Sequence, residues 1–357
     1  MVAHLCCSVD AGYFLKRLKE DFPNEKIIGF FYDPNIHPYS EFKLRSLDTK
    51  RICEKLGIEY VEGEYNYEEW LRAVKGLENE PEKGSRCSVC FDFSLEEAAR
   101  FAKKIGDNKV TTSLLMSPMK SHEQLEKVGK VIKRKYGVEF INVDYRKKGG
   151  TQAQQQYARE NQMYRQDYCG CLYGIFQQKQ NQEVIDELIS PYPFQILPSS
   201  IEEKLNFYEK RINLEKEGVK YKIIKEKFLN YRLLNSKVEV KKRIIPSYTL
   251  FYSYLDRPQR VRIDFVKGDI AYSNRAEIIF VKLSFINNLL NKEYYNINEI
   301  YQTPLDIEEE LKIREAITAV KFSLSPIIIL EDFEDVRYDV FINSKIYPDS
   351  KEILIKF

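Results

Sequence analysis

Six of the seven cysteines in this sequence stand in three close pairs. The pairs are Cys6 with Cys7, Cys87 with Cys90, and Cys169 with Cys171. In a reducing compartment, clustered cysteines indicate metal binding or redox chemistry rather than structural disulfides. Two converging pairs supply four thiolates, which is the ligand set of a tetrahedral zinc ion or of an iron–sulfur cluster. The pairs therefore predict a thiolate-bound cofactor, and both kinds of metal site remain open on this ground.

The third pair, in the stretch "YRQDYCGC", exceeds what one such cofactor needs. Two cysteines separated by one glycine can bind a metal, or they can close a small strained disulfide that is readily reduced. The surplus pair indicates either a second metal or a dithiol electron relay. Cys53 stands alone among the apolar residues of an expected helix, and we expect it to be a small buried core residue.

Strands and helices alternate over the first half of the chain, and these elements must position the cysteines. Apolar runs predict strands at residues 2–7, 26–32, 58–65, 109–115 and 138–145. Helical periodicity predicts helices between them, with Ser121 as a helix N-cap and a last helix from about residue 152 to residue 178. This alternation predicts an α/β fold with a mostly parallel sheet and flanking helices.

The cysteine pairs fall at element ends in this arrangement. Ligands of parallel sheets lie beyond the carboxyl ends of the strands, and Cys6 and Cys7 follow the first strand. Cys87 and Cys90 directly precede an expected helix, whose N-terminus favours the thiolate form. We therefore expect both pairs at one crevice.

The composition limits the class of protein. With 357 residues, of which 43% are hydrophobic and 31% charged, two globular domains are expected. A formal net charge of +2 gives no overall basic field, so a nucleic acid would bind to local basic patches. We expect no signal peptide and no membrane span, because the longest apolar runs fall short of roughly 20 residues. A cytoplasmic location follows as an expectation.

The chain changes in character after the proline-rich stretch at residues 190–200. We expect one domain over residues 1–190 and a smaller α+β domain over residues 191–357. Its expected strands are residues 248–255, 259–266 and 275–286. Residues 201–245 contain thirteen Lys and Arg residues and seven Asp and Glu residues. This excess of positive charge indicates a surface that contacts nucleic-acid phosphates, and the alternative is a solvated helix with a purely structural role.

Polar residues after the second strand are candidates for substrate contact. Asp33, Asn35, His37 and Tyr39 lie in the stretch "DPNIHPY", and they either line the crevice or simply form a turn fixed by its prolines. His4 lies within the first strand and is expected to be a hydrogen-bonded core histidine.

Basic residues outside these stretches are candidates for binding phosphate. Lys120 opens a helix, together with Ser117 and His122, at a position suited to an anion. Arg165 and the basic residues 146–148 are candidates for contacting nucleic-acid phosphates.

Five motifs carry a resemblance to a known family. In order, they are "HLCCSVD", "FYDPNIHPYSEF", "RCSVCFDFSLEEAA", "TTSLLMSPMKSHE" and "YRQDYCGCLY". From about residue 3 to about residue 177 the chain resembles the QueH-type epoxyqueuosine reductases. The resemblance implies a HUP-like α/β fold, a [4Fe-4S] cluster, and reduction of epoxyqueuosine in the anticodon loop of tRNA to queuosine. It leaves the electron donor undefined and does not extend to residues 191–357, whose basic stretch would then contact tRNA.

The family pattern also implies roles for individual cysteines. Cys6, Cys7, Cys87 and Cys90 would hold the cluster. Cys169 and Cys171 would form a redox-active disulfide. Many family members have a third cysteine where this chain has Asp10, so Asp10 is a candidate ligand of an additional iron and a candidate catalytic residue. Tyr13, Tyr39 and His37 are candidate proton donors.

Two alternatives belong to other functional classes. A HUP-fold, ATP-dependent tRNA sulfur-transfer enzyme would need a glycine-rich phosphate loop after the first strand, where this chain has only Gly12. A zinc-stabilised RNA-binding protein would use the same thiolates without catalysis. Iron with acid-labile sulfide would favour the reductase, and one zinc per chain would favour the binding protein.

Overall fold

The computed structural model of the chain describes residues 1–118, 120–166, 168–178, 190 and 195–357. The chain divides into two compact units. The first comprises Met1–Ile185, Lys204–Ile223 and Leu354–Phe357, and the second comprises Asp186–Glu203 and Ile224–Ile353. The domain boundary expected at residue 190 stays a prediction, although a helical segment beyond it packs in the first unit.

A five-stranded parallel sheet forms the centre of the first unit, which confirms the predicted sheet. Its strands are β1 (Val2–Leu5), β2 (Ile28–Phe31), β3 (Glu59–Glu62), β4 (Lys109–Thr112) and β5 (Glu139–Phe140). The order across the sheet is β3-β2-β1-β4-β5, so the winding direction reverses between β1 and β4. Ligands of such sheets bind at this reversal, beyond the carboxyl ends of the two strands.

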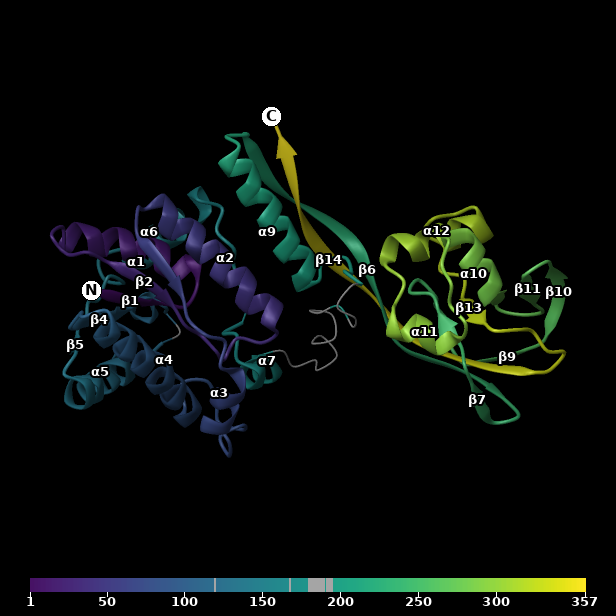
Figure 1. Cartoon of the computed structure of the whole chain (residues 1–357), viewed down its shortest axis with the longest axis horizontal. Helices are drawn as coiled ribbons and strands as arrows, with labels where there is room; N and C mark the ends of the chain where they lie inside the picture. Colours follow the sequence, from purple (N-terminus) through teal and green to yellow (C-terminus); the bar gives the residue numbers. More distant parts are fainter. Residues whose placement is uncertain (119, 167, 179–189, 191–194) are drawn as a thin grey trace. The chain divides into compact units, whose positions relative to one another are not determined.

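Helices cover both faces of this sheet, with α1, α2 and α6 on one face and α4 and α5 on the other (Figure 1). The helices of the first half are α1 (Ser8–Asp21), α2 (Tyr39–Lys55), α3 (Tyr67–Ala73), α4 (Ser85–Lys104), α5 (His122–Tyr136), α6 (Gly150–Glu160) and α7 (Leu172–Gln178), with the 3-10 turn η1 (Ser113–Met116). Every residue of β1 and β2 is buried, as the continuous apolar runs predict for a sheet covered on both faces. Ser121 caps α5 by accepting from the backbone of Gln124, and Cys53 is fully buried, as expected.

The prediction of one long helix from residue 152 to residue 178 is wrong. Helix α6 ends at Glu160, and α7 begins only at Leu172. The φ of Gln162 is 46°, which is incompatible with a right-handed α-helix, so α6 cannot continue through this residue. The carbonyls of Asn161 and Gln162 accept hydrogen bonds from arginine side chains in place of helical N–H groups. The third cysteine pair therefore lies at the end of an irregular segment, and Cys171 pairs with Ile36 in an isolated antiparallel bridge.

The second unit is rich in β-strands. One of its sheets has the order β10-β11-β12-β13-β8, and a four-stranded sheet has the order β7-β6-β14-β9. The strands are β6 (Tyr221–Val240), β7 (Arg243–Ile245), β8 (Tyr248–Thr249), β9 (Gln259–Val261), β10 (Ile263–Lys267), β11 (Ile270–Ser273), β12 (Ile279–Lys282), β13 (Ile327–Leu330) and β14 (Tyr338–Lys356). The long strands β6 and β14 each continue into the segments that pack in the first unit.

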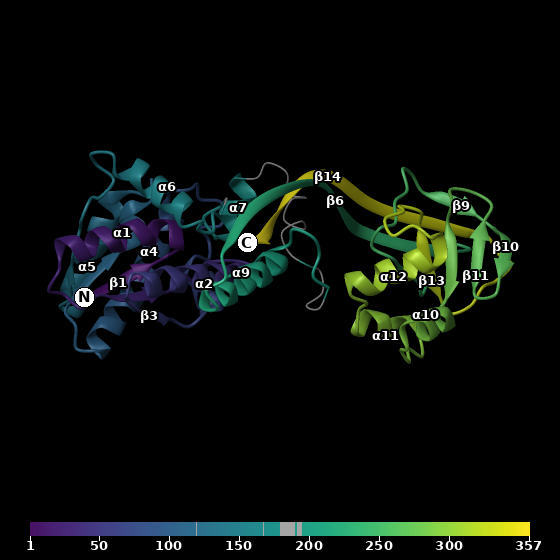
Figure 2. The same cartoon turned by 90° about the horizontal axis from the view of Figure 1, so that it is seen from above.

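Alternation along the strands divides the core of the second unit in two. Ile279 and Val281 of β12 face helices α10 (Leu283–Leu290), α11 (Ile297–Gln302) and α12 (Ile307–Thr318), which gather on one side of the sheet (Figure 2). Phe280 faces the opposite way, toward Val340 of β14. The strand expected through residues 283–286 is wrong, because these residues begin α10. No helix in the described part of the chain has the length and apolar character that crossing a membrane requires.

Candidate active site

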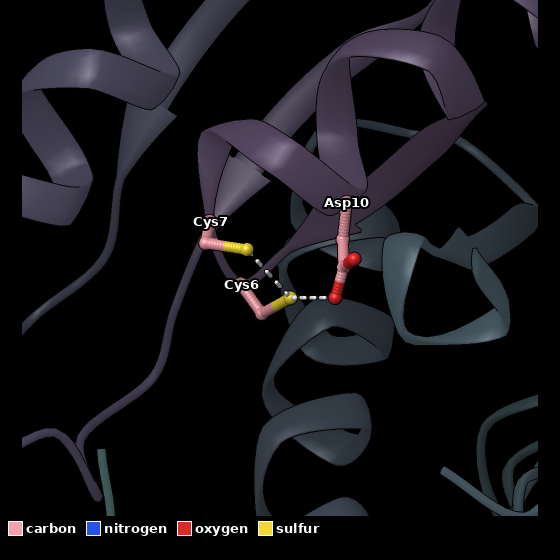
Figure 3. Close-up of side chains that lie close together, drawn as sticks. All are labelled: Cys6, Cys7 and Asp10. Atoms are coloured by element: carbon pink, nitrogen blue, oxygen red, sulfur yellow. Dashed lines mark hydrogen bonds between the residues drawn. The ribbon is translucent and has the colours of Figure 1, made fainter. Parts of the chain in front are cut away.

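The first cysteine pair lies at the reversal point of the parallel sheet. Cys6 follows β1, and its backbone N–H donates to the Ser113 hydroxyl, which follows β4, at 3.2 Å. Asp10 lies in the first turn of α1, so its carboxylate returns toward the strand end (Figure 3). The Cys6 Sγ lies 3.9 Å from the Cys7 Sγ and 3.7 Å from Asp10 Oδ2. The ligand atoms of these three residues all lie within 4.8 Å of one another, which is close enough to share a metal ion.

A cavity of about 330 Å³ opens beside this group. It is lined by residues from the ends of β1, β2 and β4, from α2 and α4, and from the irregular segment before α7. The charged, polar and sulfur-bearing residues of its wall are Cys6, Asp10, Asp33, Asn35, Arg45, Glu82, Cys90, Ser94, Ser117, Lys120, Gln166, Tyr168 and Cys169. The structure thus brings one member of each cysteine pair to the wall of a single cavity, while Cys7, Cys87 and Cys171 are not among its lining residues.

Burial controls the ionisation of the two carboxyl groups in the cavity wall. It raises the pKa of Asp10 to about 6, although a 2.7 Å hydrogen bond from Gln154 to Asp10 Oδ1 favours the anion. Burial also raises the pKa of Asp33 well above its ordinary value, and the nearby Arg45 opposes that rise only in part. Burial therefore favours the protonated form of Asp33, which can donate, over the carboxylate.

The second cysteine pair lies inside α4 rather than ahead of it. Cys87 and Cys90 occupy its first two turns, and Cys87 Sγ accepts from the backbone N–H of Lys83 at 3.3 Å. Burial outweighs the expected effect of the helix N-terminus and raises the pKa of both thiols. A bound cationic metal would supply the positive charge that buried thiolates require at this position.

Cys169 differs from these thiols because a lysine contacts it. Burial opposes ionisation of Cys169, but Lys120 Nζ lies 3.0 Å from its Sγ and lowers the pKa of the thiol. Lys120 is itself buried, yet the thiolates of Cys169, Cys87 and Cys90 raise its pKa above the ordinary value. Lys120 was expected to meet an external anion, and it instead binds the sulfur of the third cysteine pair.

All seven cysteines are free thiols in the structure. Cys171 is 8% exposed and packs in a small cluster with Trp70 and Val74, against which Cys90 also lies. The second and third pairs therefore meet, although Cys171 is outside the cavity wall. The disulfide between Cys169 and Cys171 stays a prediction.

The candidate substrate-binding residues separate into two groups. Asp33 and Asn35 are buried in the cavity wall, where Asp33 Oδ2 and Asn35 Oδ1 have no hydrogen-bond partner among the described residues. His37 stacks on Tyr67 at 5.5 Å between ring centroids, and burial lowers its pKa. Tyr39 is 54% exposed and contacts Tyr65. His37 and Tyr39 are not in the described wall of the cavity, and their contact with a substrate stays a prediction.

Two further residues named from the sequence are not among those that line the cavity. His4 is fully buried and bonds to the Thr112 hydroxyl at 2.9 Å and the Tyr32 carbonyl at 2.8 Å, so it is a core histidine. Burial lowers its pKa to about 4. Arg165 is exposed, with its guanidinium bonded to the Gln155 carbonyl, and it lies outside the cavity.

Sequence reasoning missed two residues of the site. Arg45 projects from α2 into the cavity wall and donates to the carbonyls of Tyr168 and Cys169 at 3.1 and 3.0 Å. Gln154 of α6 is 1% exposed and fixes Asp10. Lys120 was named from the sequence as a candidate for binding phosphate, but its contact with Cys169 was not expected. Glu41 and Arg45 stand four residues apart on one helix face, and this spacing of opposite charges was the available signal for Arg45.

The donor set of the site fits an iron–sulfur centre. Thiol sulfurs dominate it, which suits iron–sulfur chemistry, and the buried Asp10 adds an oxygen donor beside Cys6 and Cys7. Arg45 and Lys120 provide positive charge around the thiolates without competing as ligands.

Comparison with known proteins identifies the family. The sequence model of "Epoxyqueuosine reductase QueH" matches residues 1–177. The epoxyqueuosine reductase QueH of Helicobacter pylori is 41% identical over 346 residues, which span 93% of this chain and 94% of that protein. The chain belongs to the epoxyqueuosine reductase QueH family. The QueH of Thermotoga maritima is 34% identical over 184 residues, covering 50% of this chain and 92% of its own length.

The family relationship extends further than the motifs indicated. An alignment of 346 residues necessarily passes beyond residue 177, so the similarity to the Helicobacter pylori family member includes most of the second unit. Among solved structures, the U34-tRNA thiolase NcsA from Methanococcus maripaludis with its [4Fe-4S] cluster matches with a TM-score of 0.34 and 16% identity. This match covers 59% of this chain and 72% of the thiolase, and it is too distant to support an argument.

Proposed function

We propose that this protein reduces epoxyqueuosine in tRNA to queuosine. The observation that carries the proposal is the 41% identity to an epoxyqueuosine reductase across 93% of the chain. The reaction adds two electrons and two protons to the epoxide, breaks both of its C–O bonds, and yields an alkene and water. The cavity provides sulfur ligands, a buried acid and a paired thiolate, which are the groups that such a reduction needs.

The cofactor we infer is a [4Fe-4S] cluster held by Cys6, Cys7, Cys87 and Cys90. Asp10 is our candidate ligand for an additional iron, since its carboxylate oxygen lies beside the first cysteine pair. When bound, the cluster would supply electrons one at a time, and an additional iron would act as a Lewis acid. The Ser113 and Gln154 side chains hold Cys6 and Asp10 in the orientation that these roles require.

Residues of the chain itself would handle the protons and the second electron carrier. Asp33 is buried in the cavity wall, where burial raises its pKa, and its carboxyl group in the protonated form is suited to donate a proton to the departing oxygen. The amide of Asn35 is suited to bind a polar group of the substrate. Cys169 and Cys171 would cycle between dithiol and disulfide, giving two electrons and two protons on closing and receiving both from an external reductant on opening.

The substrate nucleoside would reach the cavity in the anticodon loop of tRNA. Proteins recognise RNA sequence mainly in such single-stranded loops, whose bases can be splayed out. The exposed Arg165 and the basic stretch at residues 201–245 are candidates for holding the tRNA backbone. We propose a cytoplasmic reaction and a HUP-like relationship for the parallel sheet.

The direct test is reduction of tRNA that carries epoxyqueuosine under anaerobic conditions. Purified protein with dithionite should convert the modified nucleoside to queuosine, seen by mass spectrometry as the loss of one oxygen atom. Boiled protein and an aerobic reaction are the controls. No conversion by protein that contains iron and sulfide would contradict the proposed function.

The cluster assignment has its own test in Cys87→Ser. The variant should lose most iron and acid-labile sulfide, because one of the proposed thiolate ligands is gone. Cys53→Ala is the matched control, since Cys53 is buried in the core outside the cavity. Wild-type iron and sulfide in Cys87→Ser would exclude Cys87 as a ligand. Family membership does not favour the sulfur-transfer enzyme or the zinc-stabilised RNA-binding protein. A content of one zinc per chain without sulfide would instead support the RNA-binding protein.

A further inference from the structure

We propose that Arg211, on a helix beyond the family-model match, is a positioning residue for Cys169. It acts through a continuous series of buried polar contacts that ends at the backbone of the third cysteine pair. The inference deepens the proposed function, because Cys169 matters to turnover only if the protein is the reductase. Its geometric part, the placement of Cys169 beside Lys120, can be tested without turnover.

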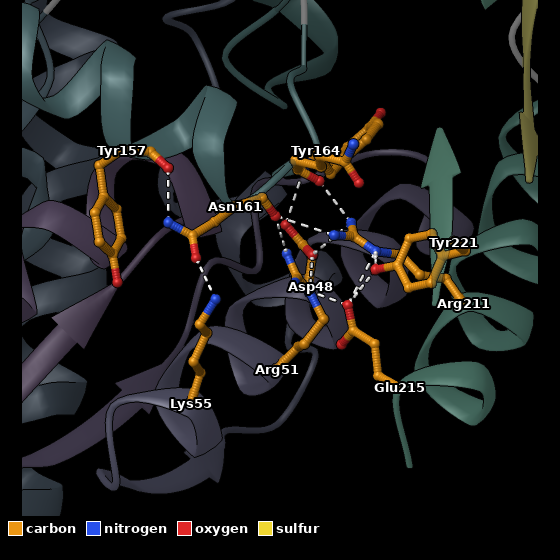
Figure 4. Close-up of polar contacts among 10 residues, drawn as sticks. Asp48, Arg51, Lys55, Tyr157, Asn161, Tyr164, Arg211, Glu215 and Tyr221 are labelled. Atoms are coloured by element: carbon orange, nitrogen blue, oxygen red, sulfur yellow. Dashed lines mark hydrogen bonds and ion pairs between the residues drawn. The ribbon is translucent and has the colours of Figure 1, made fainter. Parts of the chain in front are cut away.

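Arg211 lies on α9 (Ile201–Lys216), in the segment that packs in the first unit. Its side chain is almost fully buried. The guanidinium donates to the carbonyls of Asn161 and Gln162, where the chain leaves α6 (Figure 4). Its Nε donates to the Tyr221 hydroxyl at 2.6 Å, and it pairs with Glu215 at 3.3 Å. Arg211 therefore holds the irregular segment at its beginning.

The contacts continue through Asp48 of α2, which is fully buried. Asp48 Oδ1 lies 3.9 Å from Arg211 Nη1 and accepts from Arg51 Nε at 2.8 Å. Its Oδ2 accepts from the backbone N–H of Tyr164 at 2.9 Å. Residues 161–164 are thus fixed between α9 and α2, and Tyr208 of α9 supports the Tyr164 ring from the side.

Tyr164 connects this fixed segment to the third cysteine pair through Glu41 and Arg45. Its hydroxyl donates to Glu41 Oε2 at 2.8 Å, and Glu41 Oε1 accepts from Arg45 Nε at 2.6 Å. Arg45 then donates to the carbonyl of Cys169 at 3.0 Å. A Cβ at Gly170, where φ is +105°, would lie 3.2 Å from Arg45 Nη1, so the glycine permits this close approach.

The arrangement has one chemical consequence. Arg45 holds the backbone of Cys169, and in this position Cys169 Sγ lies 3.0 Å from Lys120 Nζ. Without Arg211 the carbonyl of Gln162 loses this donor, whereas the carbonyl of Asn161 keeps its hydrogen bond from Arg51, and we expect the segment to rearrange around Gln162. Loss of Arg211 is therefore expected to move Cys169 away from Lys120 while leaving Cys6, Cys7, Cys87 and Cys90 in place.

The experiment compares Arg211→Ala and Tyr164→Phe with wild-type holoenzyme. Tyr164→Phe removes only the hydroxyl that reaches Glu41, so it tests the middle of the series even if Arg211→Ala does not fold. Arg72→Ala is the control, because Arg72 is 72% exposed on α3 and outside the site. The measurements are iron content, kcat and KM with epoxyqueuosine tRNA, and the pH dependence of site-resolved alkylation at Cys169.

Both variants should retain iron and a KM within about twofold of wild type, while kcat falls about tenfold or more. The midpoint of Cys169 alkylation should move to higher pH, a change that a purely structural role would not produce. Arg211→Lys should recover part of both effects. The proposal is overturned if alkylation and kcat stay at wild-type values in Tyr164→Phe, or if kcat falls only in proportion to iron. If wild type itself does not turn over, the proposed function fails, and the alkylation profile alone decides the positioning role.

Discussion

Cys169 and Cys171 are chemically unequal although only one glycine separates them. Lys120 lowers the pKa of Cys169, whereas burial raises the pKa of Cys171. A dithiol relay benefits from such a difference, because the thiolate attacks first and its partner closes the disulfide. The asymmetry favours Cys169 as the thiol that reacts first.

Lys120→Gln should weaken this asymmetry. Lys120 stabilises the thiolate form, so its removal moves the pKa of Cys169 upward, and the pH profile of alkylation at Cys169 shifts to higher pH. Turnover near neutral pH should fall on the order of tenfold as the thiolate fraction drops. Lys127→Gln, on the exposed face of α5, is the control. An unshifted alkylation profile in Lys120→Gln would refute the role of Lys120.

Cys169→Ser distinguishes a relay from a metal ligand. Under the relay mechanism the variant keeps the cluster spectrum and the iron content but loses multiple-turnover reduction. Thiol counting should also find two fewer free thiols in oxidised wild type than in reduced wild type. If the variant instead loses iron in proportion to activity, and no thiols disappear on oxidation, the pair is a metal site.

At the scale of elements, the sequence predicted what depends on local pattern. All five strands of the parallel sheet were expected, because each is a short apolar run between helical segments. The end of α6 at Glu160 was missed, because no proline or glycine interrupts residues 152–168 and the break depends on Arg211, some fifty residues away. The sequence placed Cys6 and Asp10 near the end of the first strand. The contacts of Lys120 and Arg45 with Cys169 join residues far apart in the chain, so no local pattern predicts them.

Helix α12 in the second unit carries a buried acid with a measurable effect on stability. Glu310 accepts from the Tyr248 hydroxyl at 2.7 Å and the Gln195 amide at 3.1 Å, and burial raises its pKa from 4.5 to about 7. The folded state therefore keeps a proton that the unfolded state releases. The free energy of unfolding of the second unit should decrease as pH rises from 4.5 to about 7, by at most about 3 kcal/mol.

This pH dependence can be measured by amide hydrogen exchange in β12 and β13. Glu310→Gln should flatten the slope, because the variant has no proton to release, although the missing acceptor lowers stability overall. Glu308→Gln, at an exposed position on the same helix, should keep the wild-type slope. The same slope in Glu310→Gln would show that another group is responsible.

At the scale of the whole molecule, the basic stretch at residues 201–245 forms α9, β6 and β7. Lys222, Lys225 and Lys227 of β6 are exposed, so they can contact phosphates. Since residues 204–223 pack in the first unit, substitution tests tRNA binding more cleanly than truncation near residue 190.

Replacing these three lysines with glutamine should weaken tRNA binding on the order of tenfold at low salt. The slope of log K against log salt should become shallower by about 0.7–0.9 for each phosphate that the protein no longer neutralises. The control replaces Lys127, Lys130 and Lys133 on the exposed face of α5. Equal affinity and an equal salt slope in both triple variants would exclude β6 from tRNA binding.

The larger part of the second unit, residues 224–353, is inserted between two segments of the first, since residues 204–223 precede it and residues 354–357 follow it. The backbone N–H of Phe357 donates to the carbonyl of Lys220, joining these segments directly. During translation, the cysteine pairs therefore leave the ribosome before residues 354–357 of the same unit. Folding intermediates on the ribosome should contain the parallel sheet and the cysteine pairs, with the edge around Lys220 incomplete until residues 354–357 are synthesised.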